Sequence, residues 1–155
     1  MKDNGQLREH VLYLLNGDGA HLEFDAVIKE IAPKQRGAKP KRGEHSPWEV
    51  LEHLRIAQRD VLESIDSPNH VSPDFPSGYW PGSVSPPNEK AWEQSAAAFR
   101  ADLKALTEIG ASPSRDLLAP LPSGAGQTIL RKLFMLADHN SYHLGQMLLL
   151  RQLLQ

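Results

Sequence analysis

The sequence contains no cysteine among its 155 residues. This absence excludes a disulfide framework, a thiolate metal site and a thiol nucleophile of the protein's own, so any thiol chemistry would have to come from a substrate. Long apolar runs are also missing. No stretch approaches the roughly 20 apolar residues of a membrane span, and the run from Val11 to Leu15 is shorter than the apolar core of a signal peptide. We therefore expect a cytoplasmic protein with no membrane contact.

An excess of positive charge is lacking as well. The formal net charge of −2 at pH 7 argues against a general nucleic-acid surface, which depends on many Lys and Arg contacts to phosphates. One loop is a local exception, because it gathers five basic residues among prolines and glycines: Lys34, Arg36, Lys39, Lys41 and Arg42. We favour a solvated connector over an anion site there and expect no nucleic-acid partner.

The overall composition is typical of a folded globular protein. Hydrophobic residues make up 40% of the chain and charged residues 23%, values far from those of disordered chains. The length fits one domain, residues 1–155, and is sufficient to bury a core without a structural metal.

Hydrophobic periodicity predicts an all-α fold, because apolar residues recur at spacings of three and four and no segment shows strand alternation. We expect a four-helix bundle with an extra short N-terminal helix that carries Leu7, Val11, Leu14 and Leu15. The first bundle helix is predicted over about 19–31, with Asp18 as its N-cap and Pro33 after its end.

The second predicted helix has the clearest start. Ser46, Pro47 and Glu49 combine an N-cap serine, a proline at the first helical position and a glutamate three residues after the cap, which together form a capping box. An apolar stripe then continues until Asp66, where Ser67 and Pro68 stop the helix.

A long connection is predicted between helices two and three, because residues 67–87 are too rich in proline and glycine for regular structure. Loops of this length inside a compact domain are functional lids or disordered segments, and the aromatic residues here favour an ordered one. The third helix is predicted over about 88–109, with Gly110 as a left-handed C-cap, and the fourth from about 127 to the C-terminus.

The fourth predicted helix carries a pair of histidines. His139 and His143 are four residues apart, so their imidazoles lie on one helix face, close enough to chelate one ion. The pair falls within an apolar stripe, Leu136, Met147 and Leu150, where unpartnered imidazoles would cost on the order of 1–3 kcal/mol for each orphaned group. A shared metal removes that cost, whereas two histidines with ordinary hydrogen bonds are the alternative interpretation.

His53 is the expected third ligand, because it lies beside the core stripe of the second helix. A core-edge histidine with an ordinary hydrogen bond is again the alternative. Three neutral imidazoles suit one divalent transition metal, Zn²⁺ or Ni²⁺ above all, and leave a coordination position open. The metalloprotease signature is missing, since Asn140 stands where its glutamate would be, and the catalytic residues stay unknown.

Five further residues are weaker candidates. His21, Tyr79 and Trp80 are candidate substrate contacts, although an exposed histidine and rings that anchor their own loop are the alternatives. Asp138 and Gln146 flank the histidine pair and are candidates to orient the second nitrogen of a ligand, with solvent exposure as the alternative for Asp138.

Two segments, residues 46–54 and 138–146, resemble the motifs of the DinB-like (YfiT-like) metalloenzyme superfamily. The resemblance implies a four-helix bundle in which a histidine of the second helix and an HxxxH pair of the fourth bind one divalent metal. It also implies an overhand connection, which fits the long segment between helices two and three. Characterised members include transferases and isomerases that use low-molecular-weight thiols.

The sequence therefore predicts a metal-dependent enzyme that acts on a small molecule, either as a hydrolase or as a thiol-dependent transferase with a low-molecular-weight thiol as partner. The alternative is a non-catalytic metal-binding protein of stress response or partner interaction. A homodimer is compatible with either.

Overall fold

The computed structural model describes residues 5–17, 20–122 and 126–155, and the regular structure in these ranges is helical apart from one isolated bridge between Pro120 and Thr128. The predicted all-α bundle is confirmed. The helices and the two short 3-10 turns are α1 (Gly5–Leu15), α2 (Phe24–Lys29), η1 (Pro33–Gln35), α3 (Pro47–Asp66), η2 (Ser77–Tyr79), α4 (Ala91–Ala111) and α5 (Ile129–Leu153).

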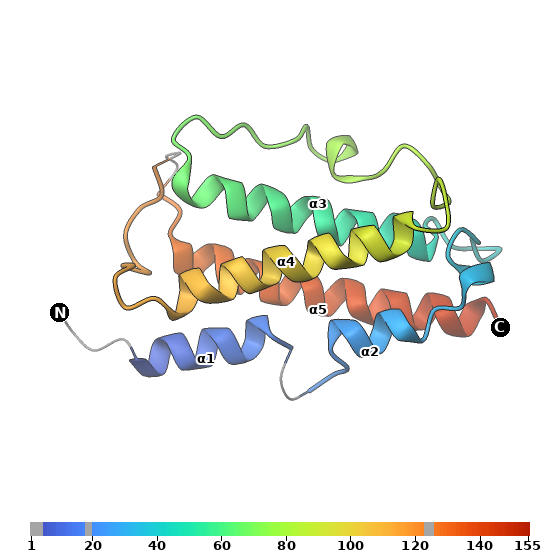
Figure 1. The fold of residues 1–155 in the computed structure, drawn as a ribbon, viewed down its shortest axis with the longest axis horizontal. Helices are drawn as coiled ribbons and strands as arrows, with labels where there is room; N and C mark the ends of the chain where they lie inside the picture. The colour runs from blue at the N-terminus through green and yellow to red at the C-terminus, as the bar shows by residue number, and fades with distance from the viewer. Residues whose placement is uncertain (1–4, 18–19, 123–125) are drawn as a thin grey trace.

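The long connection has a topological cause. In Figure 1, α3 and α4 lie side by side and run in the same direction, whereas α5 runs in the opposite one. Two parallel neighbours need a connection that returns over a whole helix, about 30 Å for the 20 residues of α3. Residues 67–90 make this return along the outside of α3.

The first position of the bundle is shared by two short helices. Figure 1 shows α1 and α2 end to end along one side, where both pack against α5. The first bundle helix predicted over 19–31 is therefore shorter than expected, because residues 21–23 before α2 are not helical and Glu23 is the extended N-cap. The predicted cap Asp18 lies outside the described residues.

The predicted start of α3 is confirmed in detail. The backbone N–H of Glu49 donates to Ser46 Oγ at 3.2 Å, and the Ser46 N–H donates to Glu49 Oε2 at 2.8 Å. The two bonds satisfy donors that a helix start leaves free, and they fix where the helix begins. As a result the register of His53, four residues after Glu49, is set by local sequence.

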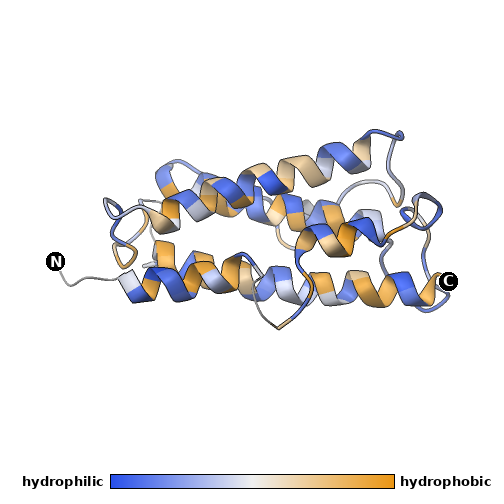
Figure 2. Ribbon diagram, turned by 60° about the horizontal axis from the view of Figure 1, so that its bottom comes forward, coloured by the Kyte–Doolittle hydropathy of each residue, from blue (hydrophilic) through white to orange (hydrophobic). Residues whose placement is uncertain are grey.

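The core divides into two apolar clusters along the bundle, and Figure 2 shows hydrophobic and hydrophilic residues alternating along each long helix. Between the clusters lies a buried polar contact: Gln58 Nε2 donates to the Phe99 carbonyl at 2.7 Å, and Asn140 Nδ2 donates to Gln58 Oε1 at 3.2 Å. This contact ties α3, α4 and α5 together beside the histidine pair. Within the described ranges, no helix has both the length and the hydrophobicity needed to cross a bilayer.

The prediction that Gly110 is a left-handed C-cap is wrong, because Gly110 lies inside α4, which ends at Ala111. A Cβ at this position would lie 2.8 Å from Leu12 Cδ2 of α1 and 3.1 Å from Leu133 Cδ1 of α5. The glycine thus allows three helices to approach closely, a requirement that helical periodicity does not reveal.

We expect Gly110→Val to lower the free energy of unfolding by about 1–3 kcal/mol, the usual cost of inserting carbons into a packed core. Gly145→Val is the matched control, since Gly145 lies inside α5 and its Cβ would meet nothing within 4 Å. The control should stay within about 0.5 kcal/mol of the wild type in urea denaturation. Equal losses in the two variants would show that helix propensity, and not close packing, selects Gly110.

Candidate metal centre

Three histidines from two helices meet between α3 and α5. The ring centroid of His53 lies 4.9 Å from that of His139 and 4.5 Å from that of His143, and the two α5 rings are 4.5 Å apart. One ligand nitrogen from each residue lies within 4.8 Å of the others. In the part of the chain that the structure describes, this is the single group of three or more potential ligands of this kind.

The proton of His53 is held on the nitrogen that faces away from the cluster. His53 Nδ1 lies 2.9 Å from the Tyr79 carbonyl, and a carbonyl oxygen only accepts, so Nδ1 is the donor. A neutral ring with its proton on Nδ1 leaves a lone pair on Nε2. His53 Nε2 lies 3.0 Å from His139 Nε2, so this lone pair is directed at the other histidines.

His143 is oriented in the same way. Its Nδ1 lies 2.7 Å from Gln146 Oε1, and the Gln146 amide nitrogen in turn donates to the Tyr142 hydroxyl at 3.0 Å. Ligating histidines almost always donate their other ring N–H to such an acceptor, which fixes the tautomer. Gln146, a candidate from the sequence to orient the second nitrogen of a ligand, lies within hydrogen-bond distance of His143 Nδ1.

His139 is the incompletely satisfied member. Its Nδ1 is buried and has no hydrogen bond of acceptable geometry, and the same is true of Asn140 Oδ1. The Asn140 side chain nevertheless lies near enough to favour the charged form of His139. A hydrogen bond between these two atoms would satisfy both, and it would leave His139 Nε2 as a lone-pair donor to the cluster.

Burial keeps all three rings neutral. Desolvation is the largest cause and lowers the pKa of His53, of His139 and of His143. Repulsion between charged imidazoles adds to it: from His45 at His53, from His53 at His139, and from His139, His53 and His45 at His143. The pKa of His143, whose exposed fraction is 7%, falls to about 4. Neutral imidazole is the form that coordinates a metal.

These features fit a divalent transition metal. Three neutral nitrogen donors converge, two of them have their second nitrogen tied to an acceptor, and the third has an unsatisfied buried nitrogen. Imidazole donors suit Zn²⁺, Cu²⁺, Fe²⁺ and Ni²⁺ and do not suit Mg²⁺ or Ca²⁺, which prefer oxygen.

The site lies within the part of the chain that matches a known protein family. The family model described as the DinB superfamily matches residues 18–147, a range that contains the three histidines and helices α2 to α4 together with most of α5. The chain belongs to the DinB superfamily. Neither curated proteins nor solved structures gave a match.

In this DinB-superfamily chain, Trp80 forms one wall of the candidate centre. Its ring stacks on His53, with centroids 4.1 Å apart and planes 6° from parallel, and its other face stacks on His45 at 3.8 Å. Trp80 also meets His143 edge-on at 6.3 Å. The predicted candidate Trp80 therefore lies against two of the three histidines, where it shields one face of His53 from water.

Tyr79 contacts the centre through its backbone and not through its ring. The carbonyl accepts from His53, whereas the hydroxyl donates to Asp60 Oδ2 at 2.9 Å. Of the two roles that the sequence left open for the Tyr79 ring, substrate contact or anchor of its own loop, the hydroxyl lies in an anchoring position.

Two other candidates lie away from the cluster. His21 Nε2 and Ser141 Oγ are 2.9 Å apart on an exposed surface. Ser141 is two residues from both His139 and His143, so it faces another side of α5. Asp138 is exposed, and its negative charge opposes the lowering of the His139 pKa.

Three further residues near the centre were not predicted from the sequence: His45, Asp60 and His70. His45 immediately precedes the N-cap of α3, and only the position of Trp80 between it and His53 gives it a place near the centre. Asp60 lies two turns after His53 on α3, a spacing that could have marked it as a residue of the same face. Nothing in the sequence around His70 connects it with Asp60.

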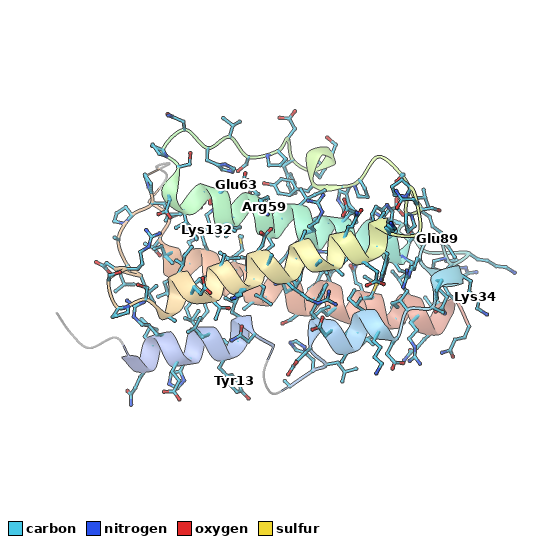
Figure 3. All side chains as sticks on the ribbon, viewed as in Figure 1. Tyr13, Lys34, Arg59, Glu63, Glu89 and Lys132 are labelled. Carbon is cyan, nitrogen blue, oxygen red and sulfur yellow. The ribbon has the colours of Figure 1, made fainter. Side chains whose placement is uncertain are left out.

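The basic loop behaves mainly as a connector. Arg36 pairs with Glu93 at 3.2 Å and lies over the Trp92 ring at 4.8 Å, and Lys39 pairs with Glu49 at 3.1 Å. The other basic residues are exposed, and Figure 3 shows Lys34 at the end of the bundle.

Proposed function

We propose that the protein is a metal-dependent enzyme that acts on a small molecule, with one divalent transition metal, zinc or nickel, held by His53, His139 and His143. The supporting observation is the convergence of three neutral imidazoles, two of which are oriented by acceptors on their second nitrogen. A purely structural site needs four protein ligands, and this one offers three, so a position would remain for water or substrate.

The chain's own residues have separate tasks in this proposal. The three histidines would bind the metal. The Tyr79 carbonyl orients His53, and Gln146 orients His143. The Trp80 ring excludes water from one face of His53. The bound metal would supply a deprotonated nucleophile near neutral pH, either water in a hydrolase or a substrate thiol in a transferase. Because the chain has no cysteine, a thiol would enter as a low-molecular-weight substrate.

The test begins with metal content. Elemental analysis of gently purified protein should find close to one transition metal per chain. The zinc- and nickel-loaded forms should then be screened against esters, phosphates, amides and thiol-conjugation substrates. We expect turnover in one class, at least about a hundredfold reduced in His53→Ala with helicity unchanged. The substrate class would decide between hydrolase and transferase, and turnover unaffected by His53→Ala would contradict the proposal.

A second candidate is a non-catalytic metal-binding protein of stress response or partner interaction. It is favoured by the position of the ligands on two different helices, because a metal there would tie α3 to α5. In that case chelation would lower the melting temperature, and the metal-loaded protein would be inactive on every substrate class.

A further inference from the structure

Asp60 is a buried carboxylate that receives two donors from the long connection between α3 and α4. Its exposed fraction is 7%. His70 Nε2 lies 2.7 Å from Oδ1, and the Tyr79 hydroxyl donates to Oδ2 at 2.9 Å. Both oxygens are thus occupied by residues of one segment, 67–90, which has little regular structure of its own.

The carboxylate remains charged in spite of its burial. Desolvation raises the pKa of Asp60, but hydrogen bonds from His70, Ser72 and Tyr79 outweigh this effect, and the pKa is lower than usual. An ionised acceptor forms stronger hydrogen bonds than a neutral one. Asp60 therefore holds the segment firmly at this point.

Tyr79 connects Asp60 to the candidate metal centre. Its hydroxyl is bound by Asp60, and its carbonyl accepts from His53 Nδ1 at 2.9 Å. The turn η2 fixes the backbone at Tyr79, since the N–H of Gly78 donates to the Asp74 carbonyl at 2.7 Å and the N–H of Tyr79 donates to the Pro76 carbonyl at 3.2 Å. A Tyr79 side chain held at Asp60 thus sets the position of the carbonyl of the same residue.

We propose that Asp60 is a positioning residue for His53. By holding the Tyr79 hydroxyl, it places the Tyr79 carbonyl where it keeps the His53 proton on Nδ1 and turns the Nε2 lone pair toward His139 and His143. This inference deepens the proposed function and rests on it for its consequence, which is the affinity of the site for metal.

A simple anchoring role would give a different pattern, and α3 carries a second carboxylate, more exposed than Asp60, that also anchors a loop. Asp66, six residues further along the helix, binds Arg115 Nη1 at 2.6 Å and Nη2 through its other oxygen. Asp66 also ties a loop to α3, but within the described residues Arg115 has no contact with the three histidines. Asp66→Asn is therefore a control for the loss of a carboxylate anchor on the same helix.

The experiment compares Asp60→Asn, Tyr79→Phe, the double variant and Asp66→Asn. Zinc affinity is measured by competition with a chromogenic chelator, and the His53 tautomer of the metal-free protein by long-range ¹H–¹⁵N NMR. We expect a 10- to 100-fold loss of zinc affinity in each single variant at the proposed positions, the range typical for residues that orient a ligand. The double variant should lose little more, because both residues act through one carbonyl.

The tautomer measurement separates positioning from anchoring. We expect His53 to be protonated on Nδ1 in the wild type and in Asp66→Asn, and to become a mixture of tautomers in Tyr79→Phe. An unchanged tautomer and unchanged zinc affinity in Tyr79→Phe, with a lower melting temperature, would overturn the proposal. If Asp60→Asn fails to fold, Tyr79→Phe alone decides.

Failure of the proposed function would give a distinct result. If the wild type binds neither zinc nor nickel at the chelator's sensitivity, the metal-dependent function fails. The His53 tautomer in the metal-free variants would still show whether Asp60 positions the ring, because that measurement needs no metal.

Discussion

Replacement of both His139 and His143 by alanine should abolish zinc binding at one ion per chain. The two residues supply two of the three converging nitrogens, and His53 alone would remain. The affinity should fall by well over the roughly hundredfold that follows loss of a hydrogen bond to a ligand, because the coordinate bonds themselves are lost. Equilibrium dialysis with elemental analysis measures the change.

The matched control replaces two histidines outside the cluster, His10 and His21, with alanine. This variant removes the same number of imidazoles but none of the converging donors, so zinc binding should stay at one per chain. Circular dichroism of both variants should retain the helical signal, because two separate apolar clusters hold the bundle together. Stoichiometric zinc binding that persists in His139→Ala/His143→Ala would contradict the site as described.

Acid should destabilise the metal-free protein well above the pH range in which carboxylates titrate. Folded His143 has a pKa of about 4, and the unfolded chain has the ordinary value of 6.5. Between these two values the unfolded chain binds a proton that the folded chain does not, so the free energy of unfolding falls as the pH falls. The loss of stability amounts to about 3 kcal/mol at pH 4, and it fades as the pH rises above 6.5.

Urea denaturation between pH 7.5 and pH 5 isolates this contribution. The lowered pKa values of His53 and His139 act in the same direction, whereas carboxylates with lowered pKa values, such as Asp60 and Asp66, lose their contribution only as the pH falls to about 4 and below. Asp102 has a pKa that burial raises, so its contribution to the free energy of unfolding increases as the pH falls. His143→Gln should flatten the profile in this window. A wild-type stability that does not change from pH 7.5 to pH 5 would contradict the burial of these rings.

The same protonation competes with metal. Because only neutral imidazole coordinates, zinc affinity should fall as the solution becomes acidic, and zinc should stabilise the protein more at pH 7.5 than at pH 5. The low pKa of His143 delays this competition, since this nitrogen stays available to well below pH 6.5.

Features that depend on residues close in sequence could be predicted from the sequence. The capping box at Ser46 and Glu49 and the four-residue spacing of His139 and His143 are properties of a single helix, so they follow from local geometry. The absence of cysteine likewise excluded a thiolate site without any structure. The all-α bundle followed from periodicity, and the choice of His53 as third ligand followed from its place beside an apolar stripe.

The tertiary structure alone decided which groups complete the centre. The partner of His53 Nδ1 is a backbone carbonyl, and backbone atoms leave no mark in a sequence. Trp80 and His45 meet because an aperiodic segment of more than 20 residues returns along α3, and no local rule fixes the path of such a segment. Gly110 looked like a helix end because glycine commonly ends helices, but the neighbouring side chains of Leu12 and Leu133 explain it. The sequence by itself determined the helices and the histidines they carry, whereas packing between distant segments decided how each imidazole is oriented.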